Sequence, residues 1–182
     1  IGTAMQFQGA QVLAVDLSMS SLAYAKRKTL ELVLTSIEYA QADLMELGSR
    51  LGASFDVIES VGVLHHLADP LAGWRVLLSL LRPSGFMKLG FYSEVARRNI
   101  VRIRTLIAEQ GYNSTVEDIR QCRQDLMDLD ESADFGTTIK SSDFFSISTC
   151  RDLLFHVQEH RMTLASIDAF LRENNLVFLR FE

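Results

Sequence analysis

Two aspartates stand at the ends of two hydrophobic segments, and together they have the chemistry of a nucleoside site. Asp16 ends "AQVLAVD" and Asp43 ends "SIEYAQAD". A carboxylate at a strand end can accept hydrogen bonds from two vicinal ribose hydroxyls. A second carboxylate one strand over can accept from the exocyclic amine of adenine, while the backbone N–H of Leu44 offers a donor to a ring nitrogen. Each aspartate could instead cap the helix after it, but two in register on successive strands favour the nucleoside.

Two adjacent histidines, His65 and His66, stand where a third hydrophobic segment ends. The stretch "SFDVIESVGVLHHLADPLAGW" (54–74) reads as a buried strand, a polar turn and a helix opened by Asp69-Pro70. Either imidazole could be a general base for a substrate that must lose a proton before it attacks. Turn carbonyls could instead hold both rings, so that they only line a pocket. We favour the second interpretation, because most pocket histidines shape a site without titrating.

A second histidine pair lies in "HVQEH" (156–160), which matches the H-x-x-E-H pattern of the inverted zinc peptidases. The pattern would place His156 and His160 on one face of a helix. Zinc catalysis also needs a third protein ligand, and the acids that follow are Asp168, Glu173 and Glu182. Short motifs often match by accident, so we expect no metal and a segment with one face near a substrate pocket.

The elements needed to position these residues follow a strand–helix rhythm. We expect strands at 10–18, 36–43, 54–61 and 85–93, because these segments are rich in Val and Leu and are bounded by turn residues. The segments between them have helical caps and helical spacing of apolar residues. This alternation predicts an α/β fold with a parallel sheet and right-handed crossovers. Ligands bind such sheets beyond the carboxyl ends of the strands.

The middle of the chain departs from this rhythm. Residues 94–150 are predicted to form a helical insertion within a single domain that spans 1–182, and the acidic stretch 128–145 is predicted to be a mobile loop or lid. A helix at 163–175 and a last strand at 176–182 restore the α/β pattern. Arg97, Arg98, Arg102 and Arg104 could meet an anionic substrate or RNA. A solvated face is favoured for them, because no aromatic residues interleave with them.

Composition limits the classes of partner. The 182 residues carry a net charge of -5, which argues against a protein-wide nucleic-acid surface. The two cysteines, Cys122 and Cys150, have no metal-type spacing and suit free thiols in the cytoplasm. No apolar run approaches the roughly 20 residues of a membrane span.

The series "VLAVDLS", "EYAQAD", "FDVIESVGVLHHLADP" and "LLRPSGFMKLG" resembles the class I, Rossmann-like methyltransferases that use S-adenosylmethionine. The segment 143–164 also resembles that of a subset of bacterial methyltransferases, some of which carry tetratricopeptide repeats. The resemblance implies a ribose contact at Asp16 and Leu17, an adenine contact at Asp43 and Leu44, and a methionine contact at Ser60, Val61 and Gly62. The methyl acceptor would be an unidentified small molecule or protein, and the residues expected near it are Tyr92, Arg97 and His156, with His65 or His66 as the candidate base.

The resemblance also predicts a deficit. The family's first strand, which is central in its sheet, and its glycine-rich loop would lie just before residue 1, with Gly2 and Thr3 at the start of the first helix. We therefore expect a fragment of the Rossmann-like fold, without the first strand, that binds the cofactor weakly. Two alternatives stay open: a nicotinamide-dependent oxidoreductase, which also places an acid after the second strand, and a non-catalytic interaction domain.

Overall fold

The computed structural model describes residues 1–7, 9–129 and 135–182. These residues form two compact units. The first unit comprises residues 1–60 and 71–89, and the second comprises 61–70 and 90–182.

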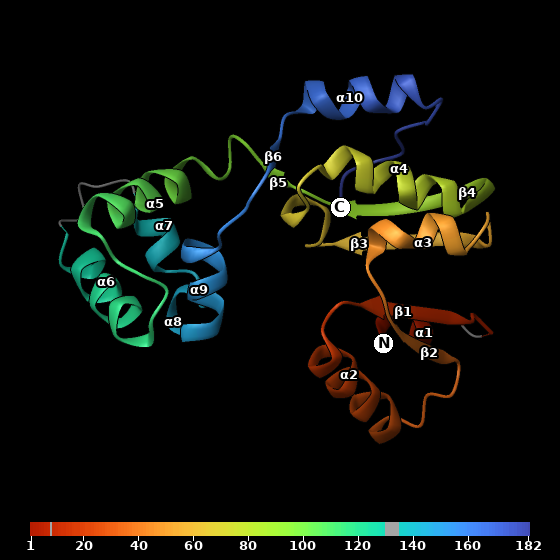
Figure 1. The fold of residues 1–182 in the computed structure, drawn as a ribbon, viewed down its shortest axis with the longest axis horizontal. Helices are drawn as coiled ribbons and strands as arrows, with labels where there is room; N and C mark the ends of the chain where they lie inside the picture. Colours follow the sequence, from red (N-terminus) through yellow and green to blue (C-terminus); the bar gives the residue numbers. More distant parts are fainter. Residues whose placement is uncertain (8, 130–134) are drawn as a thin grey trace. The chain divides into compact units, whose positions relative to one another are not determined.

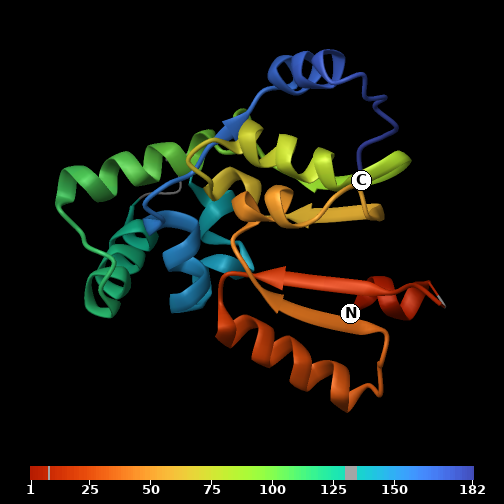
Figure 2. The same ribbon diagram turned by 45° about the vertical axis from the view of Figure 1, so that its right-hand side comes forward.

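The first unit begins with a parallel strand pair. Helix α1 (Gly2–Gln6) precedes β1 (Val12–Asp16), α2 (Met19–Glu31) and β2 (Ile37–Gln41). In the ladder, Val12 lies opposite Ile37 and Asp16 opposite Gln41, and the arrows of β1 and β2 point the same way in Figures 1 and 2. The Ser18 side chain caps α2 by accepting from the backbone N–H of Ser21 at 3.2 Å. The first two predicted strands and the helix between them are confirmed.

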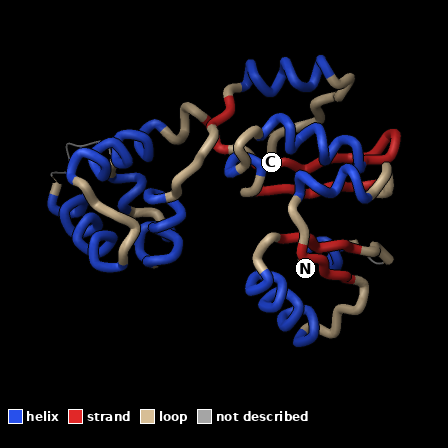
Figure 3. Tube along the Cα trace, viewed as in Figure 1, coloured by secondary structure: helices blue, strands red, loops and turns tan. Residues whose placement is uncertain are grey.

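A second strand pair completes the first unit. The elements of this part are α3 (Leu44–Arg50), β3 (Phe55–Val61), α4 (Pro70–Leu80) and β4 (Leu81–Gly90), and β3 pairs with β4. Their backbones approach closely: a Cβ on Gly85 would lie 2.9 Å from the carbonyl oxygen of Asp56. In the described part of the chain no ladder joins β1 to β3, and Figure 3 shows the strand pairs as separate red segments. The predicted α/β class is confirmed.

The second unit is mostly helical. It contains the short 3₁₀ helix η1 (Leu64–His66), β5 (Tyr92–Ser93), α5 (Arg98–Gln110), α6 (Val116–Asp128), α7 (Gly136–Ile139), α8 (Ser142–Phe145), α9 (Ile147–Phe155), β6 (Arg161–Met162) and α10 (Leu164–Glu173). Strands β5 and β6 pair in parallel, with Tyr92 opposite Arg161. This short ladder brings the segment after β4 beside the segment before α10.

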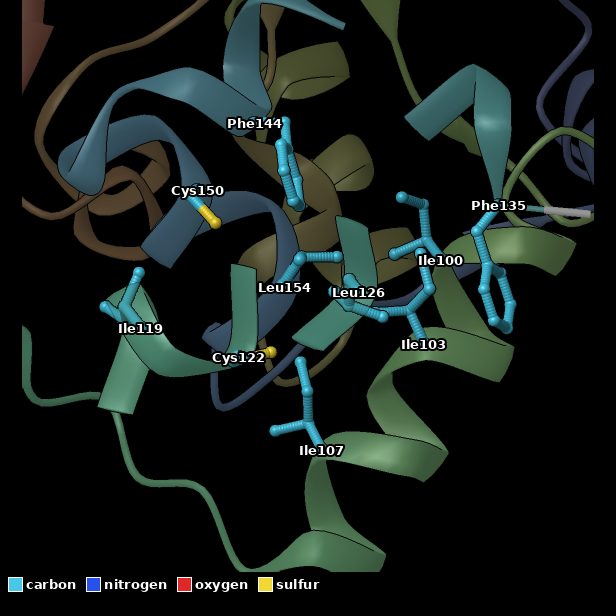
Figure 4. Packing of buried hydrophobic residues seen from close by; sticks show 10 residues of the cluster. All are labelled: Ile100, Ile103, Ile107, Ile119, Cys122, Leu126, Phe135, Phe144, Cys150 and Leu154. Atoms are coloured by element: carbon cyan, nitrogen blue, oxygen red, sulfur yellow. The ribbon is translucent and has the colours of Figure 1, made fainter. Parts of the chain in front are cut away.

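A hydrophobic core holds α5 to α9 together (Figure 4). Apolar stripes on α5 and α6 supply part of it, and both cysteines are buried in it as free thiols. Burial raises the pKa of Cys150, and raises that of Cys122 to about 12, so both thiols stay protonated at neutral pH. The core residues are Ile100, Ile103, Ile107, Ile119, Cys122, Leu126, Phe135, Phe144, Cys150 and Leu154.

Two predicted elements are wrong. The loop expected over 128–145 lies partly outside the described residues (130–134), and from Gly136 to Phe145 it is largely helical, with Phe144 fully buried and Phe145 exposed. The apolar side chains of α7 and α8 fill the helical core, which fixes this segment. Residues 176–182 form no strand, because no described segment pairs with them, and Val177 is 81% exposed. The single domain over 1–182 and the lid role of 94–150 stay predictions.

Candidate functional site

Asp16 and Asp43 lie at the same edge of the β1–β2 pair. Asp16 ends β1, and Asp43 follows β2 by two residues and caps α3. Oδ1 of Asp16 accepts from the Ser18 N–H at 2.7 Å, and Oδ1 of Asp43 accepts from the Met45 N–H at 2.8 Å. Asp43 therefore caps α3, as the simpler interpretation expected, whereas Asp16 does not cap α2 but holds the backbone N–H of its N-cap residue, Ser18. The other oxygen of each accepts no hydrogen bond from the described residues, which leaves it open to a ligand.

Leu17 and Leu44 follow these aspartates directly. The Leu17 side chain is 64% exposed, and its carbonyl accepts from the Gln41 side chain at 2.9 Å. Gln41 is the residue opposite Asp16, so this hydrogen bond joins the ends of the two strands. Leu44 is the first residue of α3, where backbone N–H groups lack helical partners.

Ser60 carries an unpaired polar group near the end of β3. Ser60 is 7% exposed, and its hydroxyl has no hydrogen-bond partner in the described part of the chain. Buried hydroxyls are nearly always paired. Gly62 follows with φ of 79°, a left-handed conformation that glycine adopts without the Cβ penalty. At the end of β3, the backbone of Gly62 is therefore exposed, and the Ser60 hydroxyl is an unpaired hydrogen-bond donor.

His65 is buried in η1. It is 1% exposed, and its ring stacks on the ring of Tyr92 at 3.8 Å between centroids. Burial first, then the charge of His66, lowers the pKa of His65 to about 4. A backbone hydrogen bond with Gly90 raises it slightly, although neither ring nitrogen has a partner of normal hydrogen-bond geometry among the residues that the structure describes. His65 is therefore neutral at physiological pH. Burial likewise raises the pKa of Tyr92, so its phenol stays protonated.

His66 is partly exposed and meets the segment that follows α9. Its Nδ1 lies 3.1 Å from the Gln158 carbonyl, and its ring stacks on that of His156 at 3.9 Å. Nearby, the backbone N–H of His160 donates to the carbonyl of His65 at 2.8 Å. Residues 156–160 are irregular, so the helix that the H-x-x-E-H pattern requires is absent. Hydrogen bonds to η1 hold this segment instead.

Glu159, the acid of that pattern, joins two arginines. Its carboxylate accepts from Arg97, with Nε to Oε1 at 3.2 Å, and from Arg104, with Nη1 to Oε2 at 3.3 Å. The side chains of Glu159 and Arg97 are 4% and 11% exposed. Burial alone would raise the pKa of Glu159, but the hydrogen bond and charge of Arg97, followed by Arg104, lower it. The solvated face expected for the arginines is therefore wrong for these two.

The second unit thus brings together five residues that the sequence singled out. Arg97 lies over the Tyr92 ring at 3.8 Å, Tyr92 stacks on His65, and His66 stacks on His156. We call these five residues the aromatic cluster: His65, His66, Tyr92, Arg97 and His156. Sequence reasoning missed Glu159 as an ion-pair partner, since it is far along the chain from Arg97 and Arg104.

Comparison with known proteins identifies part of the chain. A family model described as a methyltransferase domain matches residues 3–89. Residues 3–89 are thus similar to this methyltransferase family. The match includes both aspartates, Ser60, and the turn with His65 and His66. It supports the class I resemblance over the nicotinamide alternative.

Two relatives and one solved structure are similar to parts of this chain. An uncharacterized protein of Synechococcus is 36% identical over 54% of this chain, and a ubiquinone biosynthesis O-methyltransferase of Xanthomonas campestris is 34% identical over 49%. The alignments cover 24% and 37% of these relatives. The structure of PKMT2 from Rickettsia typhi matches 96% of this chain and 35% of its own, with a TM-score of 0.73 and 17% identity. That likeness shows the fold.

Proposed function

We propose that this chain is the core of a methyltransferase that uses S-adenosylmethionine. The observation that carries the proposal is the pair of carboxylates at one edge of a parallel strand pair, each with one open oxygen, inside the segment that matches the methyltransferase family. Asp16 and Leu17 would hold the ribose, and Asp43 with the Leu44 N–H would hold the adenine. Ser60, Val61 and Gly62 would border the methionine part, where the unpaired Ser60 hydroxyl gains a partner.

The aromatic cluster would receive the methyl acceptor. Methyl transfer from a sulfonium depends mainly on alignment of the nucleophile, the methyl carbon and the leaving sulfur. The rings of Tyr92, His66 and His156 offer flat surfaces and polar edges that would orient the acceptor for this alignment. Arg97 already shares its charge with Glu159. We therefore assign Arg97 to holding Tyr92 in place, and not to binding an anionic acceptor.

His66 is the better candidate for a base if the acceptor must lose a proton. A hydroxyl oxygen is an acceptor that loses its proton in this way. The ubiquinone-biosynthesis relatives are named O-methyltransferases, which implies an oxygen acceptor for those proteins. His65 is buried, and its pKa of about 4 makes it a weak proton acceptor. In His66 the Gln158 carbonyl holds Nδ1, which leaves Nε2 free to take the proton.

We expect weak cofactor binding by the 182-residue chain, because its sequence contains no G-x-G loop. In the resembling family that loop offers backbone N–H groups to the polar end of the cofactor. The aspartates would supply the remaining specificity.

Equilibrium dialysis with radiolabelled S-adenosylmethionine tests the proposal. Asp16→Asn and Asp43→Asn should each weaken binding by about 10-fold or more, since each removes a charged hydrogen-bond acceptor. The matched control is Glu38→Gln, which alters an exposed acid within β2. Equal binding by the aspartate variants and the control would refute the assignment. Micromolar affinity of the unaltered chain would refute the expectation of weak binding alone.

A further inference from the structure

Three metal-ligating side chains converge at one end of α9. His66, Asp152 and His156 each direct one ligand atom to the same place, and these atoms lie within 4.8 Å of one another. They come from η1, from α9 and from the first residue after α9. We propose that these three residues bind a divalent first-row transition-metal ion of the zinc type.

The ligand chemistry selects the class of ion. Two imidazole nitrogens and one carboxylate oxygen suit zinc and its neighbours in the first transition row. Calcium and magnesium prefer oxygen ligands throughout. Three protein ligands leave at least one coordination position open. Asp152 and His156 also border a cavity of about 570 Å³, from which water or a ligand group can fill that position.

The hydrogen bond to His66 prepares this ring for coordination. Metal-binding histidines almost always donate the N–H of the second ring nitrogen to a carbonyl or a carboxylate. His66 has this arrangement, because its Nδ1 lies 3.1 Å from the Gln158 carbonyl. That contact places the proton on Nδ1 and leaves the Nε2 lone pair for the ion.

His156 must turn when the ion binds. A metal lies in the plane of each imidazole that it binds, whereas the rings of His66 and His156 are stacked at 3.9 Å. Turning the His156 ring gives up the hydrogen bond that its Nδ1 accepts from the Gln158 N–H at 3.2 Å. His156 lies in irregular chain and is itself partly exposed, so its ring has room to turn. Because ion binding costs this hydrogen bond, we expect moderate affinity of the site for the metal ion.

This site differs from the one that the H-x-x-E-H pattern suggested. Glu159 is engaged by Arg97 and Arg104, and the His160 ring contacts the Gln158 side chain at 3.2 Å. The proposed site therefore uses His156 without its two motif partners. An ion here would occupy Nε2 of His66, so it would compete with any proton accepted by that nitrogen. The metal proposal itself does not depend on the proposed function.

The test uses the untagged 182-residue chain, stripped with a chelator and titrated calorimetrically with Zn²⁺. Co²⁺ titration adds a visible absorption band that reports four-coordinate geometry. We expect one bound ion per chain, with affinity lowered at least about 10-fold in His66→Ala, Asp152→Asn and His156→Ala. His160→Ala is the matched control and should bind as the unaltered chain does.

Circular dichroism of each variant checks folding. Asp152 is exposed, so Asp152→Asn keeps the test valid even where a histidine variant unfolds. Absence of Zn²⁺ binding, or binding that survives Asp152→Asn at full strength, would overturn the proposal. Equal loss in His160→Ala would also overturn it and would favour the H-x-x-E-H pair. None of these readings involves S-adenosylmethionine, so failure here leaves the methyltransferase proposal intact.

Discussion

At the scale of single residues, burial separates two neighbouring histidines. His65 is 1% exposed and stacks on Tyr92, while His66 is partly exposed and directs one nitrogen away from Gln158. The sequence shows the pair but not which ring is enclosed. The difference arises from Tyr92 and from the segment 156–160, which are distant along the chain.

The pKa of His65 predicts how stability depends on pH. Its pKa is about 4 in the folded chain and 6.5 when unperturbed, so the unfolded chain binds the proton more strongly between these values. Stability is then greatest above pH 6.5 and falls as the pH approaches 4, by about 3 kcal/mol from this residue. Urea denaturation at pH 7 and pH 4.5 measures the loss.

His65→Phe supplies the comparison for this prediction. Phenylalanine keeps a flat ring against Tyr92 but cannot be protonated. The variant should lose clearly less stability between pH 7 and pH 4.5 than the unaltered chain does. An identical loss in both proteins would mean that His65 does not titrate in this range.

At the scale of elements, the ion pairs of Glu159 connect the segment that follows α9 to helix α5 and to Arg97, the N-cap residue of α5. Arg97 precedes α5 and Arg104 lies within it, and both bind the same carboxylate. Arg104 also donates to the backbone carbonyl of His156. The network therefore fixes the segment that carries His156 and supports Tyr92 through Arg97.

Glu159→Gln should destabilise the chain by about 3 kcal/mol, because it leaves two arginines without their buried partner. Glu46→Gln makes the same chemical change in an exposed pair with Arg50, whose side chain is 67% exposed, and should cost under about 0.5 kcal/mol. Urea denaturation at pH 7 compares the two variants. Similar losses in both would contradict the structural role given to Glu159.

Local patterns predicted most of the elements, and non-local contacts explain the failures. Turn residues and hydrophobic runs located β1, β2 and β3. The stretch 128–145 looked like a loop because of its acidic and hydroxyl residues, yet burial of Phe144 makes its later part helical. The segment 176–182 has strand composition but no described partner strand. A strand requires a neighbour, which composition does not reveal.

The candidate site was predictable only in part, for the same reason. Asp16 and Asp43 were found because each follows its own strand. The pairing of Arg97 with Glu159 spans 62 positions and has no local signature. Asp152 was likewise invisible, since its neighbours His66 and His156 meet only in the folded second unit.

At the scale of the whole molecule, the methyltransferase family accounts for residues 3–89, and the aromatic cluster and proposed metal site belong to the second unit. The chain spans 24% to 37% of the two relatives described above, so their activities bear on this chain only through the shared segment. None of the described helices is long and apolar enough to cross a bilayer. The central claim is that Asp16 and Asp43, both in the first unit, bind the adenosine part of the cofactor.

Amide chemical-shift mapping during titration with S-adenosylhomocysteine tests that claim most directly. NMR detects weak binding and also locates it. We predict shifts concentrated at Asp16–Leu17, Asp43–Leu44 and Ser60–Gly62, which disappear in an Asp16→Asn, Asp43→Asn double variant. Shifts that avoid both aspartates, or unchanged shifts in the double variant, would contradict the adenosine site and with it the proposed activity.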